Sequence, residues 1–150
     1  MSIPSASSPL TPHGPGFRFV DHFALGPTPS ESPRGTATFH LSPTLSVFAD
    51  HFPGNPIMPA ALLLEHAAQA AGILWMSLAQ NSDTPSNSPL FVAGVDTLRI
   101  LGPGLPGDTL HTEVELLKEF GSLAQFQFET RSVQKTITKG RLTLSRQLKA

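Results

Sequence analysis

Residues 50–72 of this chain read DHFPGNPIMPAALLLEHAAQAAG, a loop followed by the first part of a helix. The loop covers residues 51–58, where two prolines restrict the backbone and a glycine lets it turn. We expect the helix to begin at Pro59, because proline in the first turn gives up no intrahelical hydrogen bond. Positions 60–78 are mostly apolar with little polar stripe, which predicts a buried helix around which the rest of the chain packs.

Three chemical groups come from this one stretch. Glu65 places a carboxyl group in an apolar helix, where it is costly unless it is paired or used, and a general acid is one such use. His51 lies in the loop upstream, and histidine is the commonest general base. The backbone N–H groups of the first helical turn, near Ala60, form an anion site. Together they could remove a proton next to a carbonyl group and expel a hydroxyl group.

The motif HFPGxPIMP, followed by an apolar helix with Glu fourteen positions after His, resembles the FabZ-type 3-hydroxyacyl-[acyl-carrier-protein] dehydratases. Three further segments resemble the opening strand, a central strand and a turn of that family: Phe17–Asp21, Phe91–Asp96 and Leu105–Asp108. The resemblance covers about Phe17 to Ser145. It implies an α+β hotdog fold, in which a long central helix is wrapped by an antiparallel β-sheet.

The resemblance also implies roles for His51, Glu65 and Ala60, and helix spacing adds a candidate role for Gln69. His51 takes the proton from the carbon next to the thioester, and Glu65 protonates the departing hydroxyl group. Ala60 stands where similar enzymes usually have glycine, and its backbone N–H is expected to hold the thioester oxygen. Gln69 lies one helical turn after Glu65, so it either orients that carboxyl group or satisfies a nearby backbone group.

Apolar side chains near the loop and in a later strand are expected to line an acyl tunnel, although core packing explains each of them equally well. These side chains are Phe48, Phe52, Ile57, Met58, Phe91 and Val92. The two that we assign to substrate binding are Phe52 and Met58.

The implied reaction is dehydration of (3R)-hydroxyacyl-[acyl-carrier-protein] to trans-2-enoyl-[acyl-carrier-protein], in fatty-acid synthesis or in polyene or other secondary lipid synthesis. It implies no cofactor and no metal. In similar enzymes His and Glu of one site come from two subunits, so a homodimer is expected, with a hexamer of three dimers left open. Two rivals remain: a hotdog acyl thioesterase, and a non-catalytic hotdog partner subunit.

The last thirty residues carry six basic residues and one acidic residue. In this family the substrate arrives on an acidic carrier protein, so Lys135, Lys139 and Arg141 are candidates for carrier docking. A solvated strand face is the alternative interpretation.

The composition limits the number of domains and the classes of protein to which the chain can belong. The chain has 150 residues, a formal net charge of -1 and no cysteine, which predicts one domain and excludes disulfides and zinc–thiolate sites. Nothing indicates a nucleic-acid binder, a signal peptide or a convincing membrane span, and we expect a cytoplasmic protein. Residues 1–16 are rich in Ser and Pro and are expected to be a disordered tail before a single hotdog domain at 17–150.

Alternation and turn residues predict six strands. These are Phe17–Ala24, Gly35–Leu41, Leu90–Leu101, Thr109–Phe120, Ser122–Ser132 and Thr136–Arg146.

Overall fold

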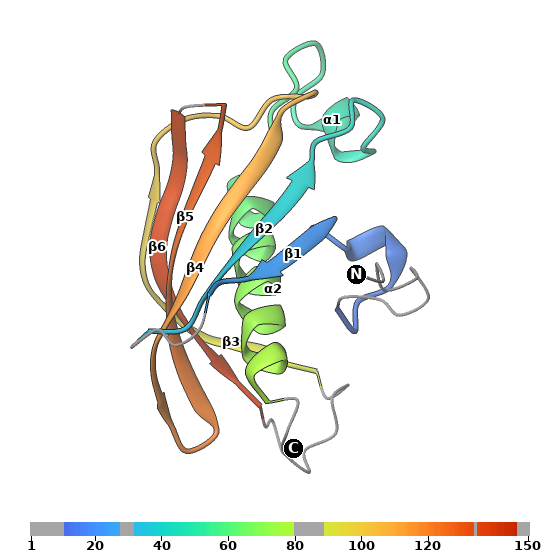
Figure 1. Ribbon diagram of the computed structural model, residues 1–150. Helices are drawn as coiled ribbons and strands as arrows, with labels where there is room; N and C mark the ends of the chain where they lie inside the picture. The colour runs from blue at the N-terminus through green and yellow to red at the C-terminus, as the bar shows by residue number, and fades with distance from the viewer. Residues whose placement is uncertain (1–10, 28–31, 80–88, 134, 147–150) are drawn as a thin grey trace.

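In the computed structural model, which describes residues 11–27, 32–79, 89–133 and 135–146, one long helix lies against a six-stranded antiparallel sheet that curves around it (Figure 1). The elements in chain order are the 3₁₀ helix η1 (Pro15–Phe17), β1 (His22–Leu25), β2 (Arg34–His40), α1 (Val47–Asp50), α2 (Ala60–Leu78), β3 (Phe91–Ile100), β4 (Thr109–Phe120), β5 (Leu123–Ser132) and β6 (Lys135–Ser145). The expected arrangement, a central helix wrapped by an antiparallel sheet, is confirmed.

The strands are arranged in the order β1-β2-β4-β5-β6-β3. β4 and β5 form a hairpin that turns at Gly121, whose φ of 63° suits glycine. β3 crosses to the far side and pairs with β6 alone, so it is an edge strand of the sheet. Its outer edge offers backbone N–H and C=O groups to another chain.

The first predicted strand is wrong in its bounds. Phe17 ends η1, and β1 covers only His22–Leu25. The physical reason is a side chain of α2: Gln69 accepts the N–H of Phe19 at 2.8 Å and donates to the carbonyl of Phe17 at 2.9 Å. These backbone groups are therefore satisfied by the helix rather than by a neighbouring strand.

Of the expected disordered tail at residues 1–16, residues 11–16 make defined contacts in the structure, and residues 1–10 lie outside the described residues. Thr11 is only 4% exposed, and its hydroxyl accepts the N–H of His13 at 3.3 Å. Arg18 Nε donates to the His13 carbonyl at 2.7 Å, and the rings of His13 and Phe17 stack. These contacts fold the segment back onto α2.

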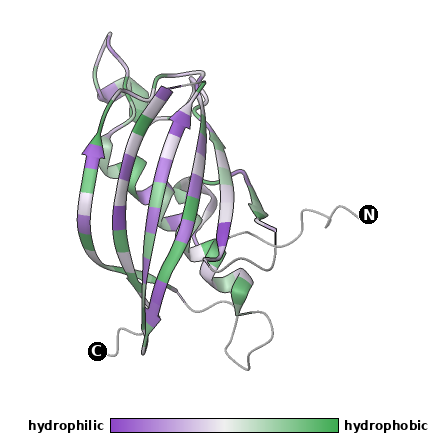
Figure 2. Ribbon diagram, turned by 60° about the vertical axis from the view of Figure 1, so that its left-hand side comes forward, coloured by the Kyte–Doolittle hydropathy of each residue, from purple (hydrophilic) through white to green (hydrophobic). Residues whose placement is uncertain are grey.

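The core lies between α2 and the inner face of the sheet. One cluster packs the middle and C-terminal half of α2, including Trp75, against Phe126 and Leu142. A second cluster packs Met58 and Leu63 at the start of the helix region against β2 and β4. Along β4, β5 and β6 buried residues alternate with exposed ones. Hydrophilic and hydrophobic bands follow one another along the strands in Figure 2.

α2 has the length and apolar composition to cross a membrane, but most of it is buried in this fold. Its apolar surface is covered by the sheet, as expected for the central helix of such a domain.

Candidate active site

The loop that carries His51 follows α1 and is held at several points by its own backbone. The N–H of His51 donates to the Val47 carbonyl at 3.0 Å, and the N–H of Ile57 donates to the His51 carbonyl at 2.9 Å. Phe52 and Asn55 exchange backbone hydrogen bonds across a turn in which Gly54 has a φ of 76°. The loop therefore fixes the position of the half-buried imidazole.

The same loop selects one tautomer of His51. The ring atom Nδ1 lies 2.9 Å from the Ile57 carbonyl oxygen, which can only accept, so Nδ1 carries the proton. A neutral ring then has a bare Nε2, the form that a general base requires. The ring also stacks on Phe52, with centroids 4.1 Å apart.

The first turn of α2 begins at Ala60, directly after the loop. The N–H groups of Leu62 and Leu63 both return to the Pro59 carbonyl, whereas the N–H of the first helical residue has no intrahelical partner by geometry. Ala60 is exposed and lies at the N-terminus of α2, the positive end of the helix dipole. This turn can hold a partly negative oxygen.

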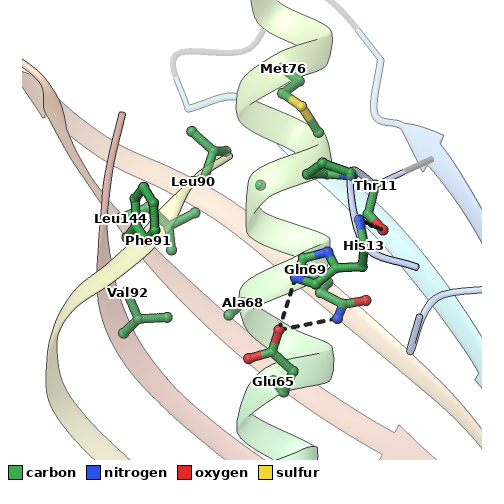
Figure 3. Close-up of a pocket in the computed structure, with 12 residues that line it drawn as sticks. Thr11, His13, Glu65, Ala68, Gln69, Met76, Leu90, Phe91, Val92 and Leu144 are labelled. Atoms are coloured by element: carbon green, nitrogen blue, oxygen red, sulfur yellow. Dashed lines mark hydrogen bonds and ion pairs between the residues drawn. The ribbon is translucent and has the colours of Figure 1, made fainter. Parts of the chain in front are cut away.

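Glu65 lies in the second turn of α2 and its side chain is 25% exposed. Gln69, one turn later, donates from Nε2 to Glu65 Oε1 at 3.1 Å. The imidazole Nε2 of His13 lies 3.3 Å from the same oxygen. Both partners thus contact Oε1, on one side of the carboxyl group (Figure 3).

Glu65 lines a cavity of about 300 Å³ between α2, the N-terminal segment and β3. The cavity is polar around Glu65 and apolar farther along the helix, where Met76 and Leu90 lie (Figure 3). Its lining residues are Thr11, Pro12, His13, Glu65, Ala68, Gln69, Gly72, Met76, Leu90, Phe91, Val92 and Leu144. The small residues on α2 leave this space open: a Cβ at Gly72 would come within 3.3 Å of Leu90.

Next to Glu65 in sequence, His66 is fully buried on the sheet side of the helix. Its Nδ1 donates to the Phe19 carbonyl at 2.5 Å, and its Nε2 accepts from Thr112, which in turn contacts Thr130. Burial lowers the pKa of His66 to about 4, so the ring is neutral at neutral pH. It joins the opening segment to β4 and β5 and does not reach the cavity that Glu65 lines.

The other predicted residues divide between surface and core. Phe52 is 49% exposed beside His51, whereas Met58 is 3% exposed and packs in the core. A direct role for Met58 in substrate binding stays a prediction. Phe91 and Val92, two of the expected tunnel residues, line the cavity.

Lys139 and Arg141 lie on the outer face of β6, beside Arg99 of β3. Lys139 is paired in register with Glu129, and Arg141 donates to Gln127 at 3.2 Å. Lys135 is exposed at the start of β6. Within the described part of the chain, no group of three or more His, Asp and Glu side chains could hold a metal ion.

Sequence reasoning missed His13, the residue that contacts Glu65 from the N-terminal segment. His13 sits in a Ser- and Pro-rich stretch, fifty-two positions before Glu65, and no local periodicity links the two. Only the fold of the segment over α2 brings them together.

Residues 28–141 match the sequence model of the ApeI-like family, described as ApeI dehydratase. A 3-hydroxyacyl-[acyl-carrier-protein] dehydratase FabZ of Shewanella sp. (strain W3-18-1) is 36% identical over 120 residues, which are 80% of this chain and 76% of that protein. A FabZ of Pseudoalteromonas translucida is 38% identical over 100 residues, which are 67% of this chain and 65% of that protein.

Among solved structures, the dehydratase heterocomplex ApeI:P from Xenorhabdus doucetiae matches with a TM-score of 0.76 at 17% identity, covering 93% of this chain and 90% of that one. At that identity the likeness shows the shared fold. The family match and the curated relatives confirm the resemblance to FabZ-type dehydratases: the chain belongs to the ApeI-like family of hotdog-fold dehydratases.

Proposed function

We propose that this chain dehydrates (3R)-hydroxyacyl chains on an acyl-carrier protein to trans-2-enoyl chains. The observation that carries the proposal is the Glu65 carboxyl group, held at the polar end of an otherwise apolar cavity. Such a cavity suits an acyl chain whose hydroxyl group meets the carboxyl group. The names of the FabZ relatives support the same substrate class.

The reaction needs one base, one acid and one oxyanion site. His51 Nε2 takes a proton from C2, and the electron pair moves through the enolate, whose oxygen the Ala60 N–H holds. The C2=C3 bond forms as the hydroxyl group leaves C3, and Glu65 supplies the proton that makes it water. The proton on His51 then returns to Glu65 through solvent, so the two groups are reset and no cofactor is consumed.

We assign the base and the acid of one site to two chains. The cavity that Glu65 lines is built from the N-terminal segment, α2, β3 and β6, and none of its lining residues belongs to the His51 loop. The outer edge of β3 offers a place for the second chain, because several of its apolar side chains are exposed: Phe91, Val92, Val95, Leu98 and Ile100. Because Phe91 and Val92 also line the cavity, a chain on this edge would close the same site.

A second copy of this chain is the proposed partner. The alternative partner is a different subunit, because the similar structure from Xenorhabdus doucetiae is described as a dehydratase heterocomplex. Sedimentation of the purified chain alone separates the two: a dimer supports the second copy, and a monomer that is active only with another subunit supports the alternative.

Carrier docking is assigned to the outer face of β6 and β3, where Lys139 and Arg141 lie beside Arg99. The negative charge of Glu129, which also pairs with Arg131, offsets part of the positive charge on this face. Charge reversal at Lys139 and Arg141 should raise KM for the carrier-bound substrate and leave kcat unchanged.

The test of the function is to incubate the protein with 3-hydroxyacyl-carrier-protein of several chain lengths, saturated and polyunsaturated, and to follow loss of water by mass. We expect His51→Ala and Glu65→Gln to lose at least about 100-fold in rate. The matched controls His22→Ala and Glu113→Gln, at exposed strand positions, should keep wild-type rates. No loss of water by the wild type on any chain would overturn the proposal, and release of free thiol would establish a thioesterase instead.

A further inference from the structure

The N-terminal segment places a second nitrogen atom, besides Nε2 of Gln69, against the Glu65 carboxyl group. His13 Nε2 lies 3.3 Å from Glu65 Oε1, and the two side chains are 30% and 25% exposed. Thr11, Arg18 and Phe17 hold His13 in place through its backbone N–H, its carbonyl and its ring. The position of this histidine is therefore built into the fold.

Gln69, the other residue that contacts Glu65 Oε1, has only one possible orientation of its side-chain amide. Its Oε1 lies 2.8 Å from the Phe19 backbone nitrogen, which can only donate. The amide NH₂ group must therefore be the end that meets the Phe17 carbonyl at 2.9 Å and Glu65 Oε1 at 3.1 Å. Glu65 Oε1 thus accepts a hydrogen bond.

His13 completes the same arrangement. Its Nδ1 is buried and no described residue hydrogen-bonds to it. A proton on Nδ1 alone would bury an unpaired N–H and would turn a bare Nε2 toward a carboxyl oxygen. A proton on Nε2 avoids both costs, so Nε2 presents its hydrogen to the side of Glu65 that Gln69 already occupies.

We infer that His13 is a positioning residue for Glu65, which together with Gln69 makes Oε1 the accepting oxygen of the carboxyl group and leaves Oε2 to carry the proton. This inference rests on the proposed function of Glu65 as the acid. With Oε1 engaged by two nitrogen groups, the acidic proton sits on Oε2, the oxygen for which the described residues provide no partner. Rotation of the carboxyl group, which would turn the proton away from the leaving hydroxyl group, is opposed by both contacts.

The kinetic test compares His13→Leu with His13→Gln, since Gln keeps an N–H donor near the position of Nε2. We expect His13→Leu to lower kcat by about 10- to 100-fold with KM within about twofold, because a hydrogen bond to a charged or acidic group contributes on this scale. His13→Gln should recover most of kcat, and His22→Leu, the same chemical change on the exposed strand β1, should have no effect.

Two kinetic results would overturn the inference. One is a His13→Leu enzyme that keeps kcat and only raises KM, which would make His13 a simple wall of the cavity. The other is a folded His13→Gln enzyme as slow as His13→Leu.

A second measurement does not need activity. ¹⁵N NMR of the imidazole rings, with the His13 signal identified by its absence in His13→Gln, should show a proton on Nε2 in the wild type. Glu65→Leu should shift the Nε2 and Nε2–H signals of His13, because the oxygen that accepts this hydrogen is gone. A bare Nε2 in the wild type, or a spectrum that Glu65→Leu leaves unchanged, would contradict the contact.

The two measurements also separate this inference from the proposed function. An inactive wild type with the expected NMR result would refute the dehydratase and keep the His13–Glu65 contact. An active wild type whose His13 ring exchanges freely between tautomers would support the dehydratase and refute the His13–Glu65 contact.

Discussion

At the scale of single residues, His66 ties the stability of the fold to pH. Burial holds its pKa in the folded protein at about 4, against 6.5 for the ordinary group. Between these values the unfolded chain binds a proton that the folded protein does not. The contribution of neutral His66 is therefore fully present above pH 6.5 and is lost as the pH falls toward 4, by about 1.4 kcal/mol per pH unit and about 3 kcal/mol in total.

The measurement is the free energy of unfolding by urea, for the wild type and for His66→Gln, between pH 4 and 8. Other titrating groups contribute to both proteins and cancel in the difference. We expect the stability advantage of the wild type to shrink by about 3 kcal/mol on going from pH 7 to 4. A difference that does not change with pH would show that His66 takes up its proton in the folded state.

The residue scale also shows where sequence reasoning worked. The spacing of Glu65 and Gln69 placed both on one helix face, and the structure joins them by a hydrogen bond. The partner His13 was assigned to a disordered tail, because nothing near it in the chain indicates that it contacts α2.

At the scale of elements, two strand glycines test how closely neighbours pack. A Cβ on Gly140 of β6 would lie 2.1 Å from the Thr97 carbonyl oxygen, close to the irregular pairing of β3 and β6. A Cβ on Gly35 of β2 would lie 2.2 Å from the tip of the Phe23 ring. A backbone carbonyl within a sheet cannot move away, whereas the half-buried Phe23 side chain can swing its ring aside by a change in χ1.

We therefore expect Gly140→Ala to cost about 3 kcal/mol of unfolding free energy and Gly35→Ala about 1 kcal/mol. Thermal and urea denaturation of the two variants beside the wild type would measure both. Equal losses would mean that the β3–β6 pairing adjusts as easily as a side chain.

Most elements follow from local pattern. α2 and the four later strands lie within about a residue or two of their predicted bounds, since periodicity and turn residues are local properties. The opening strand was wrong because its alternation is equally consistent with backbone groups that bind Gln69 of the helix.

At the scale of the whole molecule, the proposed sharing of one site by two chains gives a complementation test. His51→Ala and Glu65→Gln homodimers should each be inactive. When equal amounts are unfolded and refolded together, about half of the dimers carry one chain of each kind, and one of the two sites in each such dimer is intact. We expect about one quarter of wild-type activity in the mixture.

The control is the same mixture combined without unfolding, which should gain activity only as fast as subunits exchange. If base and acid belonged to one chain, every site in the mixture would lack one of them and no activity would return. Each variant is also refolded alone and examined by sedimentation. Recovery of dimers there shows that a lack of activity in the mixture is not caused by poor refolding.

The sequence by itself determined the central helix, the later strands and the chemical groups of residues 51–65, because each depends on neighbours close in the chain. Only the tertiary structure decided what surrounds Glu65. The folding of residues 11–16 onto α2, the contact of His13 with Glu65 Oε1 and the cavity that Thr11 and Leu144 line together join segments that lie far apart in the chain. Local sequence patterns carry no information about such contacts, since they form only when the sheet has closed around the helix.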